Sequence, residues 1–389
     1  MKNGASFYKL IFVFCFIFAL FVFLGHYLIV GSSVWGDGQY YYSYTRSLIV
    51  DGDINFKNEF EYFSLPIKKT ATGMVGNKFS LGAGLLWLPF LGLAHLVAKG
   101  DGFSNIYQIL TGFGNVFYGI LGLWFCFKIV KKYFSKKIAL MATLSLWLGS
   151  NLFFYTAVDP INSHSVSFFV ASIIILVWQQ INPQKLSQFA VLGFLIGLLA
   201  MIRTQDVIFA GPFLIWSFKD WQENKQLVLK RTLVLLVFTF IGFLPQMLVW
   251  QTLFGELKSP YLIFGERFNW LKPRIGAVLL SPSNGLFFYS PILIFSLVGL
   301  YFLFKKSRFL AVSGFFLFLL QTYIVSSWHS WSGGAAYGGR MFISLMPFYI
   351  IGLATLLEKL KLKQKLGRCI LFALVILNFV SIIRFLSMN

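Results

Sequence analysis

The sequence contains few charged residues. Asp, Glu, Lys and Arg make up 12% of its 389 residues, whereas soluble globular proteins carry about 25%. Hydrophobic residues account for 58%, and the chain has 47 Phe. This composition excludes an ordinary soluble domain and predicts a polytopic membrane protein.

Cysteine and histidine are also scarce. All three cysteines lie within apolar segments, so we infer neither a disulfide framework nor a cysteine-ligated metal site. The four histidines are scattered along the chain without the spacing of metal ligands. The sequence therefore predicts no certain cofactor and leaves the use of a divalent metal undecided.

Acidic residues are rarer than basic ones, 13 against 33, and the formal net charge is +20. The basic residues form short clusters between apolar runs, which is typical of cytoplasmic membrane loops. We therefore expect no nucleic-acid partner. Five of the acidic residues fall within 31–79, after the first apolar run. Structureless connections of this length are uncommon and often functional, so this loop is the first candidate for chemistry.

The apolar runs predict the membrane topology. The first, 10–30, has about 21 residues, too long for a cleaved signal segment, so we interpret it as an uncleaved first helix. If all twelve runs crossed the membrane, the basic segment 128–137 would lie outside, against the positive-inside rule. The conflict disappears if the Gly- and Pro-interrupted run 80–98 is re-entrant or interfacial. We therefore expect an all-α fold with about 11 transmembrane helices and a re-entrant or interfacial helix pair in the first outer loop.

This topology assigns a side to every loop. The N-terminus, with Lys2 and Lys9, is cytoplasmic, and so are the basic loops, including 358–368. The outer loops are 31–79, 159–164, 203–206, 254–285 and 327–340. Ten of the 13 acidic residues then face outward, although acidic residues did not enter the assignment. We expect one domain, 1–389, in a bacterial inner or plasma membrane, with its polar site facing the periplasm or exterior.

The first loop contains the candidate catalytic residue and a possible phosphate ligand. Asp37 follows the first helix and can act as a general base; alternatively, it caps a helix over 38–50. Asp51 and Asp53 flank a glycine and either support a metal or, as we favour, form a turn. Lys78 either binds a lipid phosphate or extends to the membrane interface.

Two short outer turns, 159–164 and 203–206, contain polar residues between apolar runs. Asp159 and His164 are candidate substrate-binding residues; alternatively, Asp159 caps the helix that follows and His164 is a structural hydrogen-bonding residue. Arg203 and Asp206 lie between two apolar runs, where charges are costly and therefore need partners. They either bind substrate or pair with each other at i, i+3.

The last two outer loops add cations and aromatic rings. Glu266 and Arg267 are candidate substrate-binding residues. They precede a Trp-containing segment, which suits either stacking against a sugar or an aromatic belt at the membrane interface. His329 and Tyr337 are further candidate substrate-binding residues, beside a Gly-rich stretch that ends at Arg340. A positive charge at a helix N-terminus interacts unfavourably with the helix dipole. We therefore expect Arg340 to pair with a negatively charged group, such as a phosphate.

Several motifs together resemble a known family. Their positions are Asp37 with the Tyr-rich 40–44, Gly52-Asp53, Lys78, Ser163-His164, SPSNGLFFYSP at 281–291 and WSGGAAYGGR at 331–340. They resemble the GT-C superfamily of polytopic glycosyltransferases, which includes protein O-mannosyltransferases and bacterial aminoarabinose transferases. The frequent acidic pair after the first helix is Asp37-Gly38 here, so a second carboxylate is missing.

The resemblance implies an inverting transfer of a sugar from a polyprenyl-phosphate donor to a lipid, glycan or protein acceptor at the outer face. Asp37 would be the base, and Lys78 and Arg340 would hold the lipid phosphate. Two other readings remain: a lipid-linked glycan flippase or transporter, and a surface-glycan ligase or polymerase. A transporter would need charges through the membrane midplane, whereas the ionisable residues here gather at one boundary.

Overall fold

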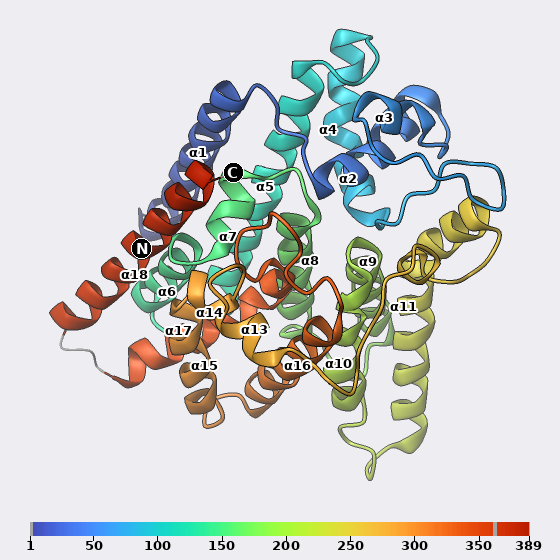
Figure 1. Cartoon of the computed structure of the whole chain (residues 1–389). Coiled ribbons are helices and arrows are strands. Elements are labelled where there is room, and N and C mark those ends of the chain that lie inside the picture. Colours follow the sequence, from blue (N-terminus) through green and yellow to red (C-terminus); the bar gives the residue numbers. More distant parts are fainter. Residues whose placement is uncertain (1–2, 361–363, 389) are drawn as a thin grey trace.

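The structure is a computed structural model that describes residues 3–360 and 364–388. It consists of helices and loops, and no strand occurs within these residues (Figure 1). Lys2 and residues 361–363 of the predicted basic loop 358–368 lie outside the described residues. The expected all-α class is therefore confirmed for the part of the chain that the structure describes.

Six helices of the described chain are long and apolar enough to cross a membrane. They are α1 (Asn3–Val30), α5 (Asn105–Val130), α11 (Lys225–Phe254), α16 (Arg308–Ser327), η4 with α17 (Arg340–Leu345 and Met346–Lys359) and α18 (Gln364–Met388). A seventh crossing is counted if α6 (Lys136–Leu148) is joined to α7 (Asn151–Phe153) and η2 (Phe154–Val158), although the two halves are bent by 75°. The chain is an integral membrane protein, and the predicted count of 11 spans is not confirmed.

The remaining predicted crossings fall on shorter helices. Four apolar helices have 10–17 residues: α4 (Gly82–Ala98), α8 (Ser163–Trp178), α9 (Leu186–Ile202) and α15 (Ile292–Leu303). At about 1.5 Å per residue, 17 residues extend about 26 Å, less than the roughly 30 Å hydrocarbon core. The adjoining polar turn η3 (Thr204–Phe209) separates α9 from α10 (Ala210–Ser217). These four helices are therefore not counted among the spans that length and composition identify.

Short helices make up much of the predicted outer loops. They are α2 (Asp37–Arg46), the π-turn η1 (Ser47–Asp51), α3 (Lys57–Tyr62), α12 (Pro260–Ile263) and α13 (Ile275–Leu280). The short helix α14 (Leu286–Tyr289) follows the fourth of these loops. In Figure 1, α2, α3 and α4 lie together at one end of the molecule, away from α18. The first loop is thus helical, as expected, but its helices are too short to span a membrane.

Glycines allow two pairs of helices to pack closely. A Cβ added at Gly197 of α9 would overlap the carbonyl oxygen of Thr239 in α11. Likewise, a Cβ added at Gly242 of α11 would overlap the carbonyl oxygen of Phe194 in α9. Helices α15 and α17 approach equally closely: a Cβ added at Gly299 of α15 would overlap the carbonyl oxygen of Gly352 in α17. Small residues at helix crossings are typical of membrane bundles, where close packing drives association.

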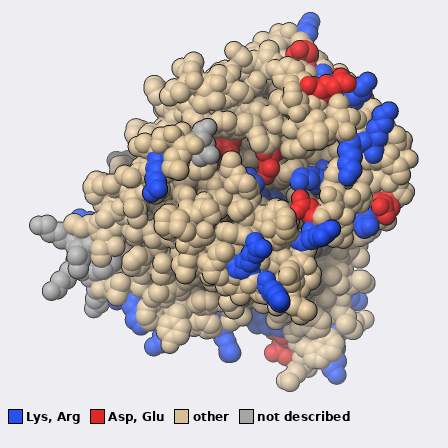
Figure 2. All heavy atoms as spheres, in the orientation of Figure 1, with Lys and Arg blue, Asp and Glu red and all other residues tan. Residues whose placement is uncertain are grey.

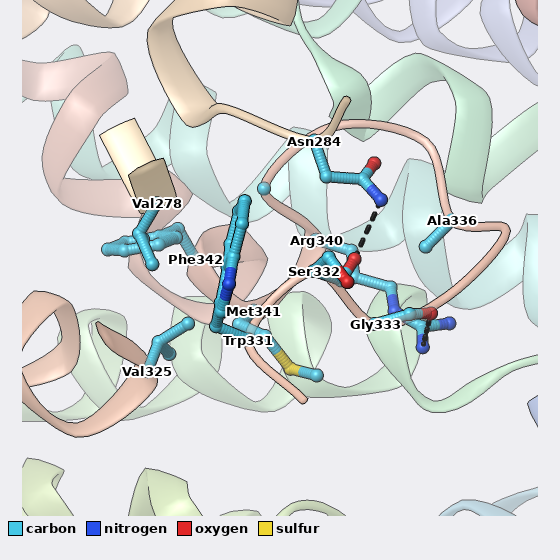
Figure 3. A pocket seen from close by; sticks show the side chains of 11 residues that line it. Val278, Asn284, Val325, Trp331, Ser332, Gly333, Ala336, Arg340, Met341 and Phe342 are labelled. Carbon is cyan, nitrogen blue, oxygen red and sulfur yellow. Dashed lines mark hydrogen bonds between the residues drawn. The ribbon is translucent and has the colours of Figure 1, made fainter. Parts of the chain in front are cut away.

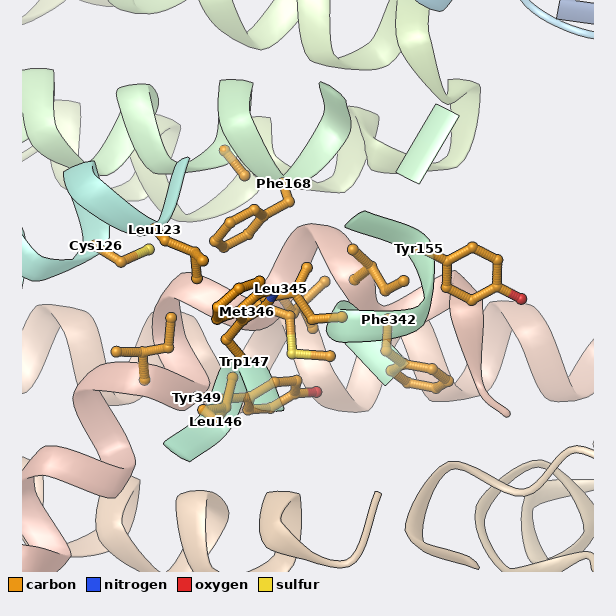
Figure 4. Packing of buried hydrophobic residues seen from close by; sticks show 14 of the residues in the cluster. Leu123, Cys126, Leu146, Trp147, Tyr155, Phe168, Phe342, Leu345, Met346 and Tyr349 are labelled. Atoms are coloured by element: carbon orange, nitrogen blue, oxygen red, sulfur yellow. The ribbon is translucent and has the colours of Figure 1, made fainter. Parts of the chain in front are cut away.

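The main core joins the middle of the bundle. Trp147 of α6 and Tyr349 of α17 are almost fully buried, and Phe168 of α8 lies beside them (Figure 4). The indole nitrogen of Trp147 donates a 2.7 Å hydrogen bond to Thr156 of η2. This bond satisfies a polar atom that would be costly to bury alone and holds the bend after α6, next to the turn at 159–162.

Candidate active site

The start of α2 places Asp37 against the second outer turn. The helix begins after Gly36, whose φ of +51° suits glycine. Gly36 occupies the N-cap position and Asp37 is the first residue of the helix, so the capping alternative for Asp37 is wrong. A Cβ added at Gly38 would overlap the carbonyl oxygen of Ile161. This contact explains why the position after Asp37 lacks a side chain: a second carboxylate there would not fit.

Asp37 forms an ion pair with Arg340, 303 positions further along the chain. Asp37 Oδ2 and Arg340 Nη2 are 2.6 Å apart, and their side chains are 33% and 13% exposed. The same Nη2 donates to the Gly333 carbonyl at 3.1 Å. Arg340 Nε is buried and has no partner among the described residues. The predicted base and the predicted phosphate ligand are therefore adjacent, and the guanidinium retains an uncommitted donor.

The loop that carries Arg340 depends on its glycines and on one asparagine. Gly333, Gly334 and Gly339 all have positive φ, which explains the Gly-rich composition. The side-chain amide of Asn284 donates to the Ser332 carbonyl at 2.7 Å (Figure 3). It also donates to the Gly334 carbonyl at 3.0 Å. The backbone carbonyl oxygen of Asn284 accepts from Gly339 N at 3.0 Å. These bonds fix the backbone on both sides of the loop.

A second ion pair joins the end of the first loop to the loop after α11. Lys78 Nζ lies 3.1 Å from Glu266 Oε1. The indole of Trp328 donates to Glu266 Oε2 at 2.9 Å, and Ser330 lies 3.4 Å from the same oxygen. Glu266 therefore holds Lys78 to the last outer loop.

Both ion pairs line one cavity of about 720 Å³. Arg203 lines it as well, and Tyr261, Phe268, Trp270 and Trp328 are among its aromatic residues. The rings of Phe268 and Trp270 are stacked at 5.1 Å. Figure 2 shows acidic and basic side chains close together over the centre and right of the molecule in that view. The cavity combines fixed charges with flat apolar surface, a combination that suits an anionic ligand with a sugar.

Arg203 and Asp206 do not pair with each other. Arg203 Nη1 donates to Ser163 Oγ at 3.1 Å and lies 2.9 Å from His164 Nδ1. Asp206 Oδ1 accepts from Ser344 Oγ at 2.9 Å, and its Oδ2 is buried without a partner among the described residues. The predicted i, i+3 pair is therefore wrong: Arg203 points to the cavity and Asp206 into the protein.

Burial raises the pKa of Asp206 from 3.8 to about 7, although Arg203 and Ser344 act in the opposite direction. The folded protein then binds this proton more strongly than the unfolded chain. The associated stability is complete below about pH 4 and is lost as the pH rises to about 7. We expect Asp206→Asn to reduce the loss of thermal stability between pH 5 and 8 by a few kcal/mol. Thermal unfolding in detergent at several pH values measures this.

The exposed Glu61→Gln variant is the control for this measurement and should keep the wild-type pH dependence. Asp159 and Glu59, whose pKa values burial raises to about 6, contribute in the same direction and remain in the variant. An Asp206→Asn protein with an unchanged slope would show that Asp206 is not a titrating group in this range.

Asp159 has a different partner from the one expected. Asn162, not Asp159, caps α8, because its side chain accepts from His164 N at 2.9 Å. Asp159 Oδ1 instead accepts from the indole of Trp35 at 2.7 Å. The capping prediction for Asp159 is wrong, and the residue fixes the segment that precedes Asp37.

The other predicted residues do not line the cavity. Asp51 pairs with Arg46, which also bonds buried Glu59 at 2.9 Å. Asp53 accepts from Ser47 Oγ at 2.8 Å and lies beyond Gly52, whose φ is +72°. The remaining three are exposed Arg267, exposed His329 and buried Tyr337, whose hydroxyl donates to Asn378 at 2.8 Å.

Several residues of the cavity were not predicted. Ser80, Thr204, Gln205, Tyr261 and Met341 line it. Thr204 and Gln205 stand between Arg203 and Asp206 in a polar run within an apolar region, and this run is a signal that sequence reasoning could have used. Tyr261 and Met341 carry no such signal. Among residues 3–360 and 364–388, no three His, Cys, Asp or Glu side chains group as metal ligands.

Comparison with solved structures identifies similar folds. ArnT, the aminoarabinose transferase of Cupriavidus metallidurans, superposes with a TM-score of 0.58 at 11% identity over 92% of this chain and 60% of ArnT. ArnT bound to undecaprenyl phosphate gives 0.57 at 12% identity, covering 91% and 61%. AglB, an oligosaccharyltransferase of Archaeoglobus fulgidus in complex with an inhibitory peptide and a dolichol-phosphate, gives 0.52 at 13% identity, covering 97% and 55%.

The chain thus spans somewhat more than half the length of these proteins. No protein-family profile and no curated protein sequence matches it. ArnT and AglB are both GT-C glycosyltransferases. The resemblance inferred from the sequence motifs is confirmed at the level of the fold.

Proposed function

We propose that this chain, whose fold is that of the GT-C glycosyltransferases, transfers a sugar from a polyprenyl-phosphate donor to an acceptor. The fold supports chemistry on lipid-linked sugars, since ArnT was solved with undecaprenyl phosphate and AglB with a dolichol-phosphate. The acceptor is a hydroxyl group of a lipid, glycan or protein. That residues 1–389 form a single catalytic domain, and that the cavity faces the periplasm or exterior, remain predictions within this proposal.

The observation that carries the proposal is the contact between Asp37 and Arg340. A base and a cation 303 positions apart in sequence meet at 2.6 Å beside a cavity that Lys78 and Arg203 also line. Transfer from a sugar phosphate needs both functions within a few ångströms, because the acceptor and the leaving phosphate both bond to the anomeric carbon.

In the proposed reaction, the bond between the anomeric carbon and the phosphate oxygen breaks, and its electron pair leaves with the phosphate. Arg340, Lys78 and Arg203 stabilise that negative charge, which grows in the transition state. The acceptor oxygen bonds to the opposite face of the anomeric carbon, so the configuration inverts. Asp37 accepts the acceptor proton through Oδ1, while Oδ2 stays bonded to Arg340.

Arg340 links the two halves of this mechanism. Its guanidinium has five donors in a planar fork, of which Nη2 holds Asp37 and Nε is uncommitted. A phosphate oxygen at Nε would therefore be bound by the same group that orients the base. The aromatic pair Phe268 and Trp270 offers a flat surface for the sugar ring.

Transfer in detergent tests the proposed function. We expect the purified chain to move a radiolabelled sugar from a polyprenyl-phosphate carrier to an acceptor in a micelle, where no membrane separates two compartments. A flippase or transporter would need sealed vesicles and would leave the sugar on its carrier. Absence of transfer with a panel of carriers and acceptors, together with movement of the intact donor across vesicles, would replace the proposal with the transporter reading.

A further inference from the structure

A groove between α1 and α5 lies apart from the cavity of the active site. Its volume is about 340 Å³, within the roughly 300–1,000 Å³ of small-molecule sites. Phe12, Val13 and Phe16 of α1 form one wall, and Phe117 and Trp124 are in the α5 wall. Both helices are candidate membrane spans, so the groove opens to the hydrocarbon region and fits an acyl chain.

One end of the groove is cationic. Lys9 lines it directly, and Lys128 Nζ lies 5.5 Å from the ring centre of Trp124, which forms part of the wall. Because α1 and α5 run in opposite directions, the start of α1 meets the basic segment after α5: Lys136 lies 5.9 Å from the ring of Tyr8. None of these three lysines has an acidic side chain within ion-pair distance in the described part of the chain.

We propose that this groove binds an anionic phospholipid, with an acyl chain along the aromatic wall and the headgroup phosphate between Lys9 and Lys128. Clustered lysines at the end of a membrane helix attract anionic headgroups, and a zwitterionic lipid would leave their charge uncompensated. A second copy of this chain fits less well, because a symmetric contact through the groove would bring two lysine clusters together.

The groove lies near the opposite membrane face from Asp37. Lys9 and Val30 are separated by about 21 residues of α1, which correspond to about 32 Å, the thickness of a hydrocarbon core. Asp37 follows the far end of α1. The lipid site is therefore distinct from the donor site, and it does not rest on the proposed function.

Lipid binding by the purified full chain tests the proposal. We expect native mass spectrometry with added phosphatidylglycerol to show a bound lipid, and phosphatidylcholine to bind much more weakly. The double variant Lys9→Gln/Lys128→Gln should lower phosphatidylglycerol affinity by roughly 10- to 30-fold. Val13→Trp, which fills the groove without changing charge, should also displace the lipid.

The matched control is Lys219→Gln/Lys225→Gln, which removes two exposed lysines from another loop on the same predicted side. It should bind phosphatidylglycerol like the wild type. Equal losses in the two double variants would mean attraction to total charge and would overturn the site, as would unchanged binding in Lys9→Gln/Lys128→Gln. A protein dimer that dissociates in the Val13→Trp variant, with no lipid adduct, would identify a second copy as the occupant.

Discussion

Replacing Asp37 by asparagine should reduce the rate of sugar transfer by about 10²- to 10⁴-fold, the usual contribution of a general base. Asparagine has the same shape, and its carbonyl oxygen can still accept the hydrogen bond from Arg340. It cannot, however, take the proton of the acceptor. We therefore expect kcat to fall while donor binding is retained, as measured with a radiolabelled lipid donor under single-turnover conditions.

The matched control is Glu61→Gln, which neutralises an exposed carboxylate of the same loop that only pairs with Lys57 at 3.7 Å. It should retain activity and stability. A fully active Asp37→Asn enzyme would refute the assignment of the base. An Asp37→Asn protein that neither folds nor binds donor would instead assign Asp37 a structural role through Arg340, and thermal unfolding distinguishes these cases.

Replacing Arg340 by glutamine should weaken donor binding and also slow the chemical step, with a loss of about 10²- to 10³-fold in kcat/KM. Two effects combine: the leaving phosphate loses a cation, and Asp37 loses the donor that orients it. Arg340→Lys should recover only part of the activity, because an ammonium keeps the charge but lacks the planar fork. Measuring kcat and KM for both variants separates the contribution of charge from that of geometry.

Arg267→Gln is the control for this experiment, since Arg267 is exposed and does not line the cavity. Its activity should stay close to that of the wild type. The double variant Asp37→Asn/Arg340→Gln should lose much less than the product of the two single losses, because the residues act as one unit. Fully multiplicative losses would mean that the ion pair has no part in the reaction.

The membrane class of the protein and the position of its acidic outer loop followed from the sequence by itself. A chain with 12% charged residues and many apolar runs has to be embedded in a membrane, because it has too few charged side chains to cover its apolar surface in water. The concentration of acidic residues in 31–79 identified the loop that contains Asp37. These are local properties, and no knowledge of the fold is needed to recognise them.

The number of membrane spans could not be predicted from the local sequence. Whether an apolar run forms a straight span, a bend as between α6 and α7, or two short helices depends on neighbouring helices. At 203–206 the polar run breaks the helix because Ser163, His164 and Ser344, from elsewhere in the chain, supply partners for its side chains. The sequence could locate this run but not its partners.

The pairing of charges was likewise decided only by tertiary structure. Asp37 could have capped its own helix and Arg203 could have bonded Asp206, since each alternative satisfies local rules. In the structure, Asp37 pairs with Arg340, 303 positions away, and Lys78 pairs with Glu266, 188 positions away. A buried charge takes the partner that the packed backbone brings within about 3 Å. The sequence by itself therefore determined which charged residues needed partners. The tertiary structure decided which partners they have, because α2 packs closely against Ile161 and Asn284 holds the glycine-rich loop that carries Arg340.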